Sequence, residues 1–119
     1  MDAKKFLQSY TRAWETKDAE LAASLFAKDA IYQETPFEDP MVGVEAIRAY
    51  WAGATGQQKD IDVLMREPTV VEDTVIAEWG VRYTHIPTGE RRELRGILIA
   101  DFEGDKVTSF REYWHRRTL

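Results

Sequence analysis

Three residues, Tyr10, Glu34 and Glu112, carry side chains that could take part in acid–base chemistry. Glu34 alternates with Tyr32 in the β-favouring run at 30–35, so both side chains are expected on one face of a short strand. A carboxylate partly withdrawn from water beside aromatic rings has a raised pKa and is a better base near neutral pH. The alternative is that Glu34 lies at the rim of a cleft and accepts a hydrogen bond from a loop amide.

Tyr10 lies on an apolar stripe that predicts a first helix over residues 3–16. The stripe recurs at three- and four-residue spacing through Phe6, Leu7, Tyr10, Ala13 and Trp14. The phenol could donate its proton to the carbonyl or enolate of a ligand. It could equally pack its ring in the core, with the hydroxyl at the edge.

Glu112 lies in the run SFREYW near the end of the sequence. A strand there alternates two sets of side chains, Phe110, Glu112 and Trp114 on one face and Arg111 and Tyr113 on the other. Inside a cavity, Glu112 could share a proton with Glu34, orient a water or neutralise an arginine. The alternative is a structural ion pair with Arg82 or Arg95.

The remaining elements place these residues in one domain. Asp18 can cap a second helix that ends near Lys28, and Gly43 opens a third helix that closes near Gly53. The hydrophobic period then changes from 3.6 to 2 and predicts an antiparallel meander of four strands, at 61–72, 75–86, 92–103 and 106–116. Helices followed by strands predict a single α+β domain over residues 1–119, with three helices covering a curved sheet.

The strand at 75–86 allows two assignments of its faces. Its alternation alone puts Glu78 and Arg82 on the solvated face, and Trp79 and Tyr83 in the core. A slip of one residue would exchange the two sets. With either assignment, an apolar set remains on each face of the sheet, and a homodimer is the simplest way to cover the outer one.

Composition excludes several classes of function. A formal net charge of -5 and a pI near 5.1 disfavour nucleic-acid binding, and no apolar run is long enough to cross a bilayer. The absence of cysteine excludes disulfides and thiolate chemistry, and we expect a cytoplasmic protein. His85 and His115 are isolated, and no phosphate-binding glycine loop or Gly-x-Ser-x-Gly motif is present, so no metal or organic cofactor is expected.

The order of the elements resembles the NTF2-like superfamily, in particular its SnoaL-like and ketosteroid-isomerase-like branch. The resemblance spans nearly the whole sequence and is carried by YTRAWETKDAELAASLFAKDAIY, PMVGVEAIRAYW and ADFEGDKVTSFREYW. With the four long strands and one short strand predicted above, it implies a cone-shaped barrel whose mouth opens on an apolar cavity. It also implies a homodimer formed through the outer face of the sheet.

The same resemblance implies roles for individual residues. Tyr10 corresponds to the first-helix tyrosine of ketosteroid isomerases and Glu34 to their general base, whereas the position of their second acid is occupied by Leu98. The register of the family turns Phe110, Glu112 and Trp114 into the pocket. In the strand at 75–86 it turns Glu78 and Arg82 into the cavity, against the assignment from alternation.

These observations predict a protein that holds a small, largely apolar carbonyl or epoxide compound. Glu34 is the predicted base, Tyr10 the hydrogen-bond donor and Glu112 an assisting acid, in a reaction of the isomerase, cyclase, dehydratase or epoxide-hydrolase type. The predicted ligand contacts are Trp14, Tyr32, Trp51, Glu78, Arg82, Leu98, Phe110 and Trp114. Two alternatives remain: a module that binds such a ligand unchanged, and an interaction protein that uses its sheet surface.

Overall fold

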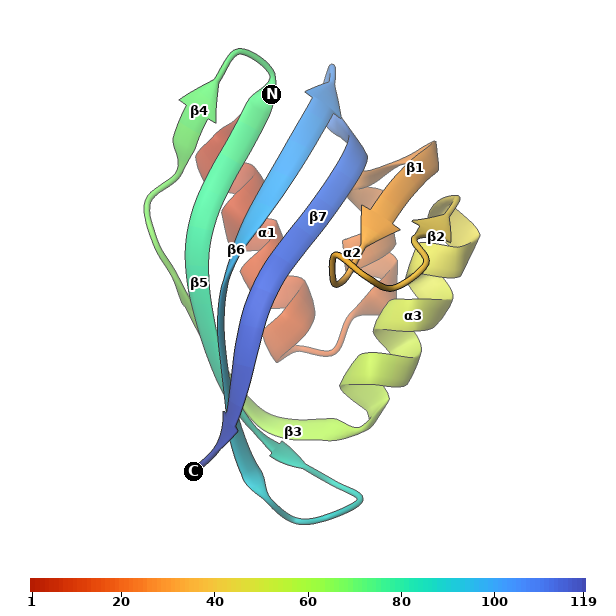
Figure 1. Ribbon diagram of the computed structural model, residues 1–119. Helices are drawn as coiled ribbons and strands as arrows, with labels where there is room; N and C mark the ends of the chain where they lie inside the picture. Colours follow the sequence, from red (N-terminus) through yellow and green to blue (C-terminus); the bar gives the residue numbers. More distant parts are fainter.

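The computed structural model describes all 119 residues as three helices packed against one face of a curved sheet (Figure 1). The elements in chain order are α1 (Ala3–Glu15), α2 (Ala19–Ser24), β1 (Phe26–Gln33), β2 (Met41–Val42), α3 (Val44–Gly56), β3 (Gln58–Met65), β4 (Thr69–Val71), β5 (Thr74–His85), β6 (Arg91–Glu103) and β7 (Lys106–Thr118). The strands form one sheet in the order β2-β1-β7-β6-β5-β3, with β4 paired to β5. The predicted α+β architecture is therefore confirmed.

Helix α2 begins where the capping side chain of Asp18 predicts. The side chain of Asp18 accepts a hydrogen bond from the backbone N–H of Leu21 at 2.9 Å, which starts α2. However, α2 ends at Ser24 and not near Lys28. Phe26 already belongs to β1, because it is buried in the core and pairs with Val107 of β7.

Two further boundaries differ from the predictions. Helix α3 continues to Gly56, three residues beyond the expected end at Gly53. The strand predicted at 61–72 is two strands, β3 and β4, separated at residues 66–68. Pro68 lies in this break and has no backbone N–H to donate to a sheet ladder.

The long strands form the predicted antiparallel meander. β5 pairs with β3 and β6, and β6 pairs with β7, all in antiparallel register. The sheet also contains one parallel pair that the sequence did not predict, between β1 and β7, so the sheet is mixed. This pair brings Tyr32 opposite Phe110 and joins the first half of the chain to its last strand.

The inner face of β5 follows the hydropathic alternation. Trp79 and Tyr83 are buried in the core, whereas Glu78 and Arg82 are exposed on the outer face. The assignment implied by the family resemblance, with Glu78 and Arg82 in the cavity, is therefore wrong. The physical reason is burial: the helices cover the face that carries the aromatic rings, and a charged pair there would lose its hydration.

Gly96 of β6 lies opposite Trp114 of β7, with no room for a side chain. A Cβ built on Gly96 would lie 2.5 Å from the carbonyl oxygen of Tyr113 and 2.7 Å from the Cβ of Trp114. A Cβ on Gly80, on the neighbouring strand, would meet nothing closer than 3.6 Å. An alanine therefore fits at Gly80 and not at Gly96.

We expect Gly96→Ala to lower the free energy of unfolding by about 1–3 kcal/mol, because backbone must move to admit the methyl group. Urea denaturation of the purified protein measures the change. Gly80→Ala is the matched control and should leave the transition midpoint nearly unchanged. Equal destabilisation by the two variants would show that close approach at Gly96 is not the cause.

None of the helices is both long enough and apolar enough to cross a membrane.

Candidate functional site

A cavity of about 280 Å³ lies between the inner face of the sheet and the helices α1 and α3. Its lining includes all four tryptophans of the chain and four of its five tyrosines. These aromatic residues are Trp14, Trp51, Trp79, Trp114, Tyr10, Tyr32, Tyr50 and Tyr83. The cavity is therefore shaped mainly by rigid, flat rings, with two carboxylates, Glu34 and Glu112, among them.

Glu112 is the buried carboxylate of this cavity, with 4% of its surface exposed. The Tyr10 hydroxyl donates a hydrogen bond to Glu112 Oε1 at 2.5 Å, and the Tyr32 hydroxyl donates to the same oxygen at 3.3 Å. Both bonds fall on Oε1, which leaves Oε2 without a protein hydrogen-bond partner. Glu112 thus has one oxygen fixed by tyrosines and one free for a ligand.

The surroundings of Glu112 set its protonation. Burial raises the pKa of its carboxyl group from 4.5 to about 7. The hydrogen bonds from Tyr10 and Tyr32 lower this pKa, and the nearby charge of Glu34 raises it further. Near neutral pH, Glu112 can therefore either accept or donate a proton.

The alternative of a structural ion pair at Glu112 is wrong. Arg82 and Arg95 lie on the outer face and contact Glu93, with nitrogen–oxygen distances of 3.0 and 3.5 Å. Glu112 faces inward, as the family resemblance implied for its face of the strand. Its partners are the tyrosine hydroxyls of Tyr10 and Tyr32.

Glu34 lies directly after β1 and not within a strand at 30–35, so that predicted boundary is wrong. The residue lines the cavity and is half-buried. The indole N–H of Trp114 donates to its backbone carbonyl at 3.0 Å, which ties the end of β1 to β7. Its carboxylate also acts on Tyr50: burial raises the pKa of Tyr50, and the charges of Glu112 and Glu34 raise it further. The two carboxylates therefore influence the same aromatic end of the cavity.

Phe110 packs against the two tyrosines whose hydroxyl groups donate to Glu112. Its ring stacks on Tyr32 at a centroid distance of 4.6 Å and on Tyr10 at 5.6 Å. Phe110 and Leu98 are fully buried and lie outside the lining of the cavity. The prediction that they contact a ligand is not supported, because both are core residues beneath the site.

The other predicted site residues divide between the cavity and the outer surface. Tyr10, Trp14, Tyr32, Glu34, Trp51, Glu112 and Trp114 line the cavity, whereas Glu78 and Arg82 do not. The cavity is also lined by five residues that were not predicted as ligand contacts: Tyr50, Trp79, Tyr83, Arg92 and Arg116. Alternation from Trp114 would have found Arg116, and the hydropathy of β5 would have found Trp79 and Tyr83.

No group of three or more histidine, cysteine, aspartate or glutamate side chains is arranged to hold a metal ion. His85 lines the cavity and bonds through Nδ1 to the Thr88 hydroxyl at 2.9 Å, whereas His115 is exposed.

The helices on a curved sheet and the aromatic cavity define a protein of the NTF2-like class. The sequence profile described as the SnoaL-like domain matches residues 7–110, and the chain belongs to this family. The resemblance inferred from the sequence is therefore confirmed. No curated protein matches the sequence.

Solved structures share the fold over nearly the full length. SalBIII, an epoxide hydrolase/cyclase-like enzyme in pyran ring formation in the polyether salinomycin, is 17% identical with a TM-score of 0.85, covering 98% of this chain and 95% of that one. A ketosteroid isomerase-like protein from Catenulispora acidiphila, in complex with trimethylamine, is 18% identical with a TM-score of 0.84, covering 94% and 86%. An LEH-like epoxide hydrolase of M. tuberculosis is 14% identical with a TM-score of 0.79, covering 95% and 82%.

Proposed function

We propose that the protein binds a small, largely apolar organic molecule in the cavity and moves a proton on it without a cofactor. The observation that carries this proposal is Glu112, a buried carboxylate held by Tyr10 through one oxygen while the other oxygen has no protein partner. A pKa of about 7 lets this group act as a base in one step and as an acid in the next.

The proposal changes the roles that the sequence predicted. Glu112 becomes the principal acid–base group, because it is buried, whereas the predicted base Glu34 is half-buried. Tyr10 and Tyr32 act as positioning residues that orient the Glu112 carboxylate. Glu34 supplies a second carboxylate at the same cavity, as a partner that raises the pKa of Glu112.

A free Glu112 oxygen supports two kinds of step. It can remove a proton from the carbon beside a carbonyl and return it elsewhere, which gives isomerase, cyclase or dehydratase chemistry. It can also remove a proton from water or from a hydroxyl group that attacks an epoxide carbon. The epoxide C–O bond then breaks, and the resulting alkoxide takes up the proton from Glu112. Relatives of the same fold that act as epoxide hydrolase/cyclase-like enzymes support the second kind.

The alternative is binding without chemistry. A ketosteroid isomerase-like relative in complex with trimethylamine and a computationally designed 17-OHP binder show that this fold can hold small molecules. The aromatic lining of the cavity is sufficient for such a role. An interaction protein with a closed interior is less well supported, because the cavity retains about 280 Å³.

Solvent deuterium exchange tests the acid–base proposal directly. Small cyclic ketones are incubated with the protein in D₂O, and deuterium incorporation beside the carbonyl is followed by NMR, with cyclic epoxides screened in parallel for ring opening. The proposal expects catalysed exchange or opening that is lost in Glu112→Gln. Ketones or epoxides that bind and are recovered unlabelled and unopened would favour the binding module.

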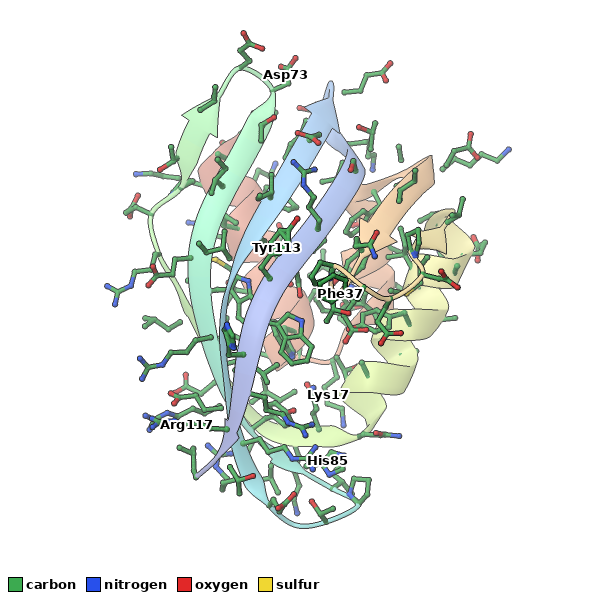
Figure 2. The ribbon with its side chains drawn as sticks, viewed as in Figure 1. Lys17, Phe37, Asp73, His85, Tyr113 and Arg117 are labelled. Atoms are coloured by element: carbon green, nitrogen blue, oxygen red, sulfur yellow. The ribbon has the colours of Figure 1, made fainter.

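The outer face of the sheet supports the homodimer that the sequence predicted. Leu64, Ile97 and Tyr113 expose 59%, 42% and 45% of their surfaces there, and Figure 2 shows Tyr113 on the side of β7 turned away from α1. Ile97 and Tyr113 are opposed on adjacent strands, so they form one apolar patch.

A cytoplasmic location stays a prediction of the sequence.

We expect sedimentation velocity to show a dimer that Ile97→Glu converts to a monomer, because a charge in the patch would be buried in the interface. Val42→Glu, at an exposed apolar residue on the short edge strand β2, is the matched control and should leave the dimer intact. A monomer in the unmodified protein at micromolar concentration would contradict the proposal.

A further inference from the structure

One end of the cavity carries three basic side chains on three adjacent strands. His85 of β5, Arg92 of β6 and Arg116 of β7 all contribute to its lining, and His85 lies at the end of β5 in Figure 2. The register pairs Arg92 with Tyr83 and Arg116 with Leu94. Arg92 is therefore a diagonal neighbour of both His85 and Arg116 on the inner face.

These side chains retain hydrogen-bonding capacity. Arg116 forms no ion pair, and Arg92 uses one terminal nitrogen on Glu90 at 2.8 Å while its Nε is buried without a partner. The indole N–H groups of Trp51 and Trp79, which also line the cavity, are buried without partners. Trp51 packs against Tyr10 and Trp79 against Trp14, so the donors with spare capacity at the basic end are those of Arg92 and Arg116. A buried donor without a partner costs about 1–3 kcal/mol.

The basic end is separated from the carboxylate of Glu112. Arg116 follows Glu112 by four residues on β7, which places their Cα atoms about 13 Å apart along an extended strand. The space between them is lined by the aromatic rings. A cavity of about 280 Å³ is at the lower limit of small-molecule sites, so it fits a compact molecule with one ring.

We propose that the ligand is a compact alicyclic or aromatic carboxylic acid, whose carboxylate binds at Arg116 and Arg92 while its ring lies among the aromatic side chains. Guanidinium groups match the planar geometry of a carboxylate and bind it through charge-assisted hydrogen bonds. The orientation places the atoms remote from the carboxylate against Glu112. This inference rests on the proposed function in using the same cavity, and it names the class of substrate.

Matched pairs of acids and their primary amides test the inference. The probes are cyclohexanecarboxylate with cyclohexanecarboxamide, and cyclohexylacetate with cyclohexylacetamide, titrated while tryptophan fluorescence is recorded. All four tryptophans line the cavity, so binding there changes the signal. We expect each acid to bind at least about tenfold more tightly than its amide, the ratio typical of one hydrogen bond to a charged group.

Arg116→Gln should remove most of this preference and leave binding of the amides unchanged. Arg116 is exposed, so the variant should fold, and an unchanged thermal midpoint confirms it. Arg95→Gln is the matched control, because Arg95 lies on the outer face of the same sheet and should not affect either probe. Equal binding of acids and amides, no binding of the acids, or an intact preference in Arg116→Gln would overturn the inference.

Glu112→Gln separates this inference from the proposed function. The variant should retain the preference for acids, because Arg116 and Arg92 are unchanged. If the unmodified protein shows no preference for acids over amides but still catalyses deuterium exchange on neutral ketones, only the choice of substrate class is overturned. An acid preference without any catalysed exchange or epoxide opening would overturn only the proposed chemistry.

Discussion

Replacing Glu112 by glutamine should slow catalysed proton exchange by about 10²–10⁴-fold, the usual contribution of a positioned general acid or base. Glutamine keeps the shape of the side chain and an oxygen that can accept from Tyr10 and Tyr32. The variant therefore removes the titrating group with little change in packing. Rates of deuterium incorporation in the two proteins, measured with the same ketone, give the effect.

Glu34→Gln is the informative comparison, because the sequence favoured Glu34 as the base. The charge of Glu34 raises the pKa of Glu112, so its removal should shift the rising limb of the pH–rate profile from about 7 to lower pH. The maximal rate should change far less than in Glu112→Gln. A greater loss of rate in Glu34→Gln than in Glu112→Gln would return the role of base to Glu34.

Local patterns correctly predicted the buried stripe of the first helix and the alternation of the last strand. The stripe of α1 is buried as expected, because three- and four-residue spacing is a property of the helix itself. The alternation in SFREYW separated Glu112 from Tyr113 correctly, and the family resemblance turned Glu112 inward, where it is buried. In β5, alternation was correct where the register taken from the family resemblance was wrong.

The contacts that define the site could not be predicted from local patterns. Tyr10 and Glu112 are separated by 102 positions in the chain, and Tyr32 and Glu112 by 80. The Tyr32 contact depends on the parallel pairing of β1 with β7, and the Tyr10 contact depends on the packing of α1 against β7. No periodicity encodes either arrangement. The sequence therefore identified an acid and a phenol of the site without showing that they are hydrogen-bonded to each other.

The two faces of the sheet shift the pKa of a glutamate in opposite directions. On the outer face, hydrogen bonds from Arg82 and Arg117 lower the pKa of Glu93 to about 2, and the charge of Arg95 contributes. On the inner face, burial raises the pKa of Glu112 to about 7. A titratable carboxylate near neutral pH thus requires the apolar interior and the absence of an arginine partner.

The stability of the protein should fall between pH 5 and pH 8 because of Glu112. Its pKa is about 7 in the folded protein and near 4.5 in the unfolded chain, so the folded state binds more protons in this interval. The stability contribution of protonated Glu112 is fully present below pH 4.5 and is lost as the pH rises through about 7. The loss corresponds to about 3 kcal/mol in the free energy of unfolding.

The prediction is measured by urea denaturation at pH 5 and pH 8, for the unmodified protein and for Glu112→Gln. Subtracting the two profiles isolates the contribution of Glu112 from that of other titrating groups. Between pH 5 and pH 8, the free energy of unfolding should fall less in Glu112→Gln than in the unmodified protein. Glu93 does not contribute in this interval, because its stabilisation is lost only as the pH falls from 4.5 through about 2.

Glu78→Gln, at an exposed glutamate on the outer face, is the matched control and should show the same loss of stability between pH 5 and pH 8 as the unmodified protein. If Glu112→Gln lost stability as steeply as the unmodified protein, Glu112 would already be ionised at pH 5, and its proposed role near neutral pH would have to be withdrawn.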